Sequence, residues 1–104
     1  MSEKLTPVMK RKQRYIAFVI EGSSTDRKDM INKIMNNFSY NEYQEISPWL
    51  TVFTGDKGII RCNHDKKDEA VKILNSIKIS EGEVKTITTS GTIKKAKERL
   101  FEHD

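Results

Sequence analysis

One segment, Arg14–Ile20, constrains the fold more than any other, because its apolar side chains occupy both alternating sets of an extended chain. Successive side chains of a β-strand point to opposite faces of the sheet. One face would carry Tyr15, Ala17 and Val19. The even-numbered residues from Ile16 to Ile20, on the other face, are also apolar, and a strand of this kind is covered on both sides. We therefore expect helices on one face of a sheet, and either a further helix or another protein on the second face.

The rest of the chain alternates between helical and extended patterns. Apolar residues at helical spacing predict a helix from a cap at residues 24–26 to about residue 38, and a second helix capped by Asp65 and ended by residues 80–82. Runs of β-forming residues predict strands at 49–54, 59–63 and 84–88, the first two joined by a hairpin turn. The segment at residues 39–47 is short and ends before Pro48, so it is expected to form a loop with a possible helical turn.

This order of elements predicts the fold class. Strand, helix, strand, strand, helix and strand make the split βαβ arrangement, an α+β sandwich of the ferredoxin-like or RNA-recognition-like kind. We expect a four-stranded antiparallel sheet with two helices on one face and an extra C-terminal helix. Since 104 residues make one small domain, residues 14–104 are expected to form a single α/β sandwich, preceded by a basic flexible arm at residues 1–13.

Positive charge is concentrated near the start of the chain. The net charge is +4, and the first 14 residues carry five Lys or Arg against one Glu. The cations nearest the first strand are Lys10, Arg11, Lys12 and Arg14. Such asymmetry favours a polyanionic partner. The arm alone is equally compatible with a solubilising tail and with a segment that follows a phosphate backbone.

A second basic cluster begins the C-terminal helix. Ser90 or Thr92 can cap this helix, and Lys94 and Lys95 point away from its apolar side. Lys97 falls within the apolar side, where its stem can pack while its ammonium reaches water. Exposed N–H groups beside cations suit a phosphate backbone. The alternative is a terminal helix with a solvated basic face.

Several kinds of chemistry are not supported by the residues. The single cysteine, Cys62, cannot form an intrachain disulfide, and with His64 and the distant His103 it does not supply a zinc site, so we assign no metal ligand and no catalytic residue. The returning strand at residues 59–63 has no aromatic side chain, so base stacking on this sheet is not expected, and Arg61 is left to pair with a phosphate or a carboxylate. No apolar run is long enough for a membrane span and no secretory signal is evident, so we expect a soluble cytoplasmic protein without a membrane partner.

Three segments together resemble a known family: Arg14–Phe18, Gly58–Cys62 and Val84–Lys95. In this order and spacing they are similar to the archaeal ribonuclease P protein component 2 family, whose eukaryotic relatives serve in ribonuclease P and ribonuclease MRP. The resemblance covers about residues 14–100. It implies a non-catalytic RNA-binding subunit that supports a catalytic RNA in removing 5′ leaders from precursor tRNA.

The resemblance also implies partners and a site. The RNA would carry the catalytic centre and its magnesium ions, so no cofactor is expected on this chain. Its partners would be ribonuclease P RNA, precursor tRNA, and ribonuclease P protein component 3 in a heterotetramer, with other holoenzyme proteins. The expected RNA-binding residues are Lys10, Arg11, Lys12, Arg14, Arg61, Lys94, Lys95 and Lys97. The expected protein interface is Tyr15, Ala17 and Val19.

Two other functions fit the same predicted fold. One is a small-molecule regulatory or acyl-phosphate-hydrolysing module, and its enzymatic version would need an arginine in the glycine loop after the first strand. That loop here is Glu21–Ser24, and the next arginine is Arg27. The other is a basic protein–protein adaptor.

Overall fold

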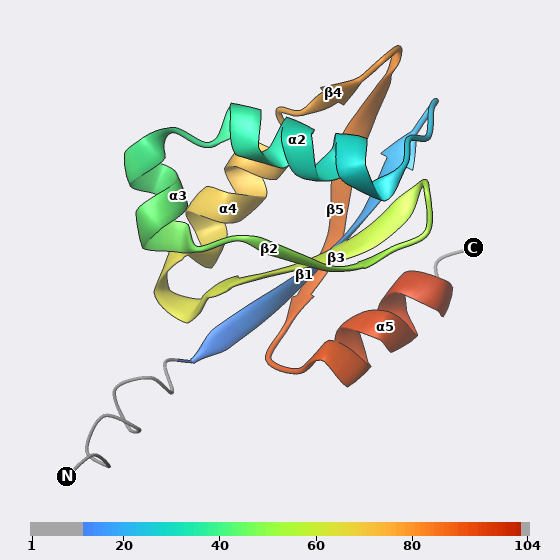
Figure 1. The fold of residues 1–104 in the computed structure, drawn as a ribbon. Coiled ribbons are helices and arrows are strands. Elements are labelled where there is room, and N and C mark those ends of the chain that lie inside the picture. Colours follow the sequence, from blue (N-terminus) through green and yellow to red (C-terminus); the bar gives the residue numbers. More distant parts are fainter. Residues whose placement is uncertain (1–11, 103–104) are drawn as a thin grey trace, which may run out of the picture.

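The computed structural model describes residues 12–102, which form an α/β sandwich (Figure 1). Lys10 and Arg11 of the predicted arm lie outside the described residues, and so does His103. The elements in chain order are β1 (Gln13–Glu21), α2 (Arg27–Asn37), α3 (Tyr40–Ile46), β2 (Trp49–Phe53), β3 (Lys57–Asn63), a short 3-10 turn η1 (His64–Lys66), α4 (Lys67–Leu74), β4 (Lys78–Ile79), β5 (Gly82–Ser90) and α5 (Ile93–Glu102). The first strand therefore begins at Gln13, inside the predicted arm.

The strands form one antiparallel sheet in the order β2-β3-β1-β5-β4, with β1 at its centre. The predicted α+β class with an antiparallel sheet is confirmed, but the predicted number of strands is wrong. The fifth strand, β4, has two residues and pairs with the start of β5, Lys78 opposite Glu83 and Ile79 opposite Gly82. The chain reverses between them through Ser80, whose φ of 54° is left-handed.

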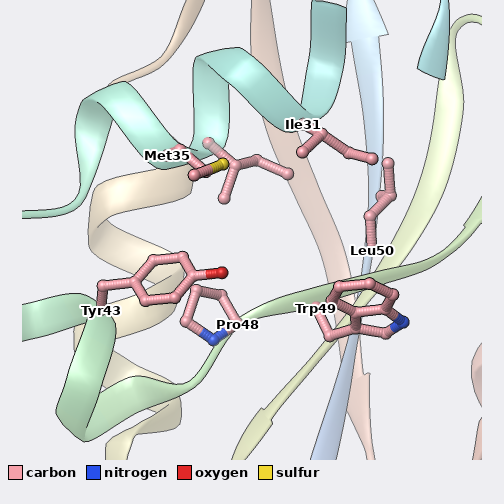
Figure 2. Close-up of a pocket in the computed structure, with 7 residues that line it drawn as sticks. Ile31, Met35, Tyr43, Pro48, Trp49 and Leu50 are labelled. Carbon is pink, nitrogen blue, oxygen red and sulfur yellow. The ribbon is translucent and has the colours of Figure 1, made fainter. Parts of the chain in front are cut away.

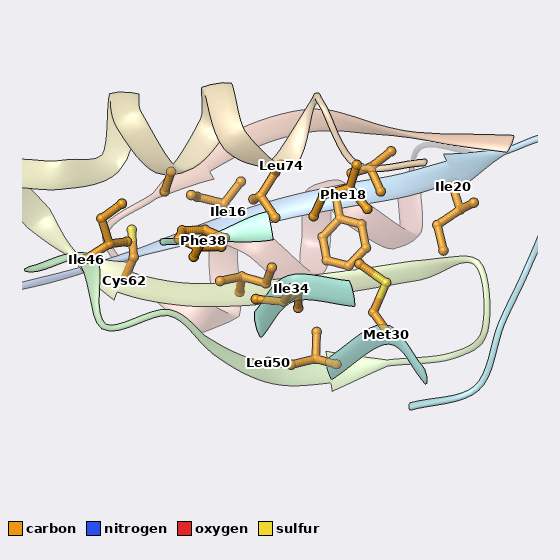
Figure 3. Close-up of a cluster of buried hydrophobic side chains, with 14 of the residues drawn as sticks. Ile16, Phe18, Ile20, Met30, Ile34, Phe38, Ile46, Leu50, Cys62 and Leu74 are labelled. Carbon is orange, nitrogen blue, oxygen red and sulfur yellow. The ribbon is translucent and has the colours of Figure 1, made fainter. Parts of the chain in front are cut away.

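The main core lies between the sheet and the helices α2, α3 and α4, which cover one face (Figure 1). Figure 3 shows Ile16 and Phe18 of β1 pointing into this layer, with Met30 and Ile34 of α2 and Leu74 of α4 around them. Ile16, Phe18, Met30 and Leu74 are fully buried. The even-numbered side chains of β1 from Ile16 to Ile20 thus fill the larger of the two cores.

The second face of the sheet is covered by α5, the chain's own C-terminal helix (Figure 1). Ala96 and Leu100 of α5 are fully buried against Ala17 and Val19 of β1 and Ile59 of β3. The sequence predicted that either a further helix or another protein would cover this face, and in the structure the helix α5 covers it. Ala17 is 0% exposed and Val19 is 8% exposed, so α5 covers two of the three residues for which a protein interface was expected. Tyr15 packs partly against the same cluster.

Local capping explains where the helices begin. Asp26 accepts a hydrogen bond from the Asp29 amide, as one of the three caps predicted for the first helix. Residues 40–46 form a helix rather than the predicted loop, because Ser39 and Glu42 make a reciprocal capping box. The predicted Asp65 cap is wrong, since η1 precedes α4 and no side chain caps that helix.

Two close contacts hold the edge strand β2 in place. The Arg27 guanidinium donates to the Leu50 carbonyl at 2.6 Å and so ties α2 to β2. Gly58 of β3 leaves no room for a side chain, because a Cβ there would lie 2.6 Å from the Phe18 ring and 2.9 Å from the Val52 carbonyl oxygen. Within residues 12–102, no helix combines the length and apolar character needed to cross a membrane.

Candidate nucleic-acid interface

The turn that opens α5 is fixed by its own side chains, as the sequence predicted. The Ser90 hydroxyl accepts from the Thr92 amide at 3.3 Å, and the Thr92 hydroxyl accepts from the Lys95 amide at 3.2 Å. These bonds satisfy two of the N–H groups at the turn and the helix start. Lys94 and Lys95 follow in the first turn of α5 and are exposed.

Arg14 lies beside this turn although it is far away in the sequence. The pairing of β1 with β5 places Tyr15 opposite Ser90, so Arg14 comes level with Gly91. A Cβ on Gly91 would lie 3.0 Å from the Arg14 guanidinium nitrogen Nη1. The glycine therefore lets the guanidinium pass close to the backbone, and it brings Arg14 to the basic start of α5.

Arg61 lies on the same face of the sheet as α5. It is exposed on β3, between Tyr15 of β1 and Trp49 of β2, its two partners in the pairing register. Residues directly opposite in antiparallel strands share a face and have Cβ atoms about 5 Å apart. The three side chains therefore form one row across the sheet.

Lys97 belongs to the side of α5 that faces β3. Residues 94, 97 and 101 line one side of a helix, and Phe101 lies under the Lys57 ammonium of β3, 5.9 Å from the ring centroid. Lys94 and Lys97 therefore project along the side of α5 nearest to β3. Both are exposed.

The cations predicted to bind RNA lack carboxylate partners among the described residues, whereas several other lysines form ion pairs. Among the described residues, no ion pair joins a carboxylate to Arg14, Arg61, Lys94, Lys95 or Lys97. Lysines that do pair with carboxylates in this part of the chain are Lys66, Lys67, Lys78 and Lys85. The charge of the predicted cluster is therefore not neutralised within the described fold.

Lys12 extends this basic region toward the arm. It is exposed, and its carbonyl accepts a hydrogen bond from the His64 amide at 3.0 Å. That bond holds residue 12 against the end of β3.

The sequence reasoning missed two surface features, and Trp49 belongs to both. The first is the Trp49 side chain itself, which is 53% exposed beside Arg61 and was interpreted only as a strand former. The second is an apolar hollow between α2, α3 and the start of β2 (Figure 2). It is lined by Ile31, Ile34, Met35, Tyr43, Pro48, Trp49 and Leu50. Met35 is 52% exposed at this hollow, a pattern visible in the sequence only as an apolar residue at the margin of a helix face.

The described residues do not assemble a nucleophilic or metal site. Residues 12–102 contain no group of three His, Cys, Asp or Glu side chains placed to hold a metal ion. Cys62 is buried, and this burial raises the pKa of its thiol to about 11. A thiol of that pKa stays protonated at neutral pH and is a poor nucleophile.

Comparison with known proteins identifies the family. The family model described as the Rpp14/Pop5 family matches residues 14–101. The chain belongs to the Rpp14/Pop5 family. Curated relatives include ribonuclease P protein component 2 of Pyrococcus furiosus, 30% identical over 97% of this chain and 95% of the relative. The protein of the same name from Methanosarcina barkeri is 31% identical over 97% of this chain and 81% of the relative.

The fold of this Rpp14/Pop5 member also occurs in a solved structure. A chain in the cryo-EM structure of yeast ribonuclease MRP matches it with a TM-score of 0.63. The match covers 89% of this chain and 94% of that chain at 14% sequence identity. At this identity the likeness establishes a shared fold.

Proposed function

We propose that this chain is a protein subunit of ribonuclease P that binds the catalytic RNA and supports removal of 5′ leaders from precursor tRNA. The observation that carries the proposal is family membership over residues 14–101, with nearly full-length relatives that bear the name ribonuclease P protein component 2. In this function the RNA performs the cleavage, and its magnesium ions belong to the RNA. The protein contributes charge and shape.

The basic start of α5 supports this role physically. Arg14, Lys94 and Lys95 gather at one turn and have no described carboxylate partner. A compact RNA concentrates phosphate charge, and each cation that contacts a phosphate releases condensed counterions. Such contacts position the protein on the RNA without reading its sequence. We infer that these residues, with Lys12, Arg61 and Lys97, contact phosphates, and that the charges of Lys10 and Arg11 add to the affinity for RNA.

Specific partners form part of the same proposal. We propose that the chain assembles with ribonuclease P protein component 3 in a heterotetramer, acts on precursor tRNA, and works in the cytoplasm. Because α5 covers the face that includes Ala17 and Val19, the protein contact would use another surface of the chain. Isolation of the tagged chain from its native source, followed by identification of the bound RNA and proteins, tests all of these partners.

The acyl-phosphate alternative receives no support from the loop after β1. The first arginine beyond that strand, Arg27, donates to the Leu50 carbonyl. Its guanidinium is therefore engaged in holding β2 instead of being directed at a phosphate in the loop.

A charge-reversal experiment tests the RNA-binding role. The Lys94→Glu/Lys95→Glu double variant should bind ribonuclease P RNA more weakly, and its log–log salt slope should decrease by about 0.9 for each phosphate that the protein no longer neutralises. Lys33→Glu/Lys72→Glu is the matched control, because both lysines are exposed on helices of the opposite face and the net charge changes equally. At each salt concentration from low to moderate, the loss of RNA affinity relative to the unaltered chain should be far larger for Lys94→Glu/Lys95→Glu than for the control. Equal decreases in the two variants would contradict a localised phosphate site.

A further inference from the structure

One corner of the sheet face beside α5 combines an exposed aromatic ring with cations. Trp49, Arg61 and Tyr15 stand side by side on β2, β3 and β1. α5 packs on Ala17, Val19 and Ile59, and it leaves Arg61 exposed and Trp49 53% exposed. The open corner is therefore formed by the exposed side chains of Trp49 and Arg61, with the partly buried Tyr15 between them and α5.

An irregularity in β2 puts Trp49 on this face. The pairing of β2 with β3 shifts between Leu50 and Val52, so that one extra residue is accommodated. Leu50 and Phe53 then pack toward the main core, while Val52 packs under α5. In Figure 2, Leu50 points toward Ile31 of α2, and the indole lies across the β2 ribbon from it. In a regular strand Trp49 and Phe53 would point to the same face of the sheet. The shift places them on opposite faces.

The nearest wall of the corner is basic. Lys94 and Lys97 lie on the side of α5 that also carries Phe101, and Phe101 meets Lys57 of β3. No ion pair links Arg61, Lys94 or Lys97 to a carboxylate among residues 12–102. A protein ligand would have to supply several acidic groups here, whereas every nucleotide supplies both a flat base and a phosphate. The charge pattern therefore favours RNA.

We infer that this corner binds an unpaired nucleotide of RNA, with its base stacked on Trp49 and Arg61 and its phosphates near Lys94 and Lys97. The inference rests on the proposed RNA-binding function and goes beyond it, because it names the strand type that is bound. Bases in a duplex are stacked on one another and cannot offer a free face, whereas unpaired bases stack on aromatic rings and on arginine planes. It also reverses the expectation that this sheet stacks no base.

Trp49 reports directly on the proposed contact, because it is the only tryptophan in the chain. The full chain would be titrated at low salt with a single-stranded RNA dodecamer and with a twelve-base-pair RNA duplex, each labelled at one end. Fluorescence anisotropy of the label would measure binding, and Trp49 emission would measure stacking. The single strand should quench Trp49 saturably with the same midpoint as the anisotropy. The duplex should bind with much less quenching.

Substitutions test whether the ring contributes to affinity. Trp49→Ala should weaken single-strand binding by about tenfold, since removal of an aromatic side chain abolishes the stacking of one base. Trp49→Phe should retain most of the affinity, because phenylalanine keeps a flat ring and also favours β-strand conformation. Tyr40→Ala is the matched control, as Tyr40 is 78% exposed on α3 and lies away from this corner. Thermal melting would establish that each variant is folded.

The outcomes separate this inference from the proposed function. If the single strand binds but neither quenches Trp49 nor loses affinity in Trp49→Ala, the stacking site is wrong and RNA binding stands. If neither RNA binds the chain at low salt, the proposed function fails as well. If Trp49→Ala leaves RNA affinity unchanged and weakens assembly with the other proteins of a reconstituted holoenzyme, the corner is a protein interface and the inference is overturned.

Discussion

Replacement of Leu100 by alanine tests whether α5 belongs to the folded domain in its own right. Leu100 is the largest fully buried side chain that α5 contributes to the second core. Leu→Ala substitutions at buried sites cost about 2–5 kcal/mol, because apolar burial is reduced and a cavity remains. A domain of this size is stable by about 5–15 kcal/mol, so the cost is a large fraction of the total.

Urea unfolding followed by the fluorescence of Trp49 measures this cost. With a slope of about 1–3 kcal/mol per molar urea, Leu100→Ala should lower the midpoint by about 1 M or more. Phe101→Ala is the matched control, because Phe101 is the next residue and is 48% exposed. Although it removes a larger side chain, it should cost only about 1 kcal/mol, in keeping with its partial burial.

The ranking of the two variants decides the outcome. If Leu100→Ala costs no more than the roughly 1 kcal/mol expected for Phe101→Ala, then Leu100 is not in a packed core. The isolated chain would then leave the second face of its sheet open, and another protein would be needed to cover it.

Two further predictions concern the interior of the domain. Gly58→Ala should destabilise the fold by about 1–3 kcal/mol, because the added methyl group would overlap the Phe18 ring and the neighbouring backbone, and an unchanged urea midpoint would contradict this packing. Cys62 should resist a thiol reagent at pH 8 in the folded chain and react in urea, because burial raises its pKa from 9.0 to about 11. By the same linkage, the unfolded thiol loses its proton first, so it should contribute a fall in stability as pH rises from about 9 toward 11, and Cys62→Ala should make that fall smaller. Rapid stoichiometric labelling under native conditions would show that the thiol is accessible.

Local patterns in the sequence predicted most of the fold because they reflect local physics. The apolar segment at Arg14–Ile20 required two covered faces, and both are covered. The cap at Thr92 and the exposure of Lys94 and Lys95 followed from helix geometry alone. The helix at residues 40–46 was missed because its short length and the following proline outweighed a capping box that the sequence does contain.

Features set by long-range pairing were not predictable in this way. The two-residue β4 pairs with β5 across a short local turn, and it was missed for a different reason, since it is too short to leave a periodic signal. The row of Trp49, Arg61 and Tyr15 depends on the register of three strands and on the shift within β2. The proximity of Arg14 to Gly91 likewise depends on the pairing of β1 with β5. Neither of these last two relations can be read from residues that are neighbours in the chain.

The two margins of the sheet have a consequence for how the free chain behaves in solution. Unpaired strand edges invite identical chains to add to them and aggregate. One edge here ends in the two-residue β4, whose Lys78 pairs with Glu83. On the other, Arg27 occupies the Leu50 carbonyl, and the irregularity in β2 interrupts the regular spacing of its backbone groups. Both edges are thereby poor templates for another strand, so we expect the newly made protein to resist fibril-like stacking while it awaits assembly.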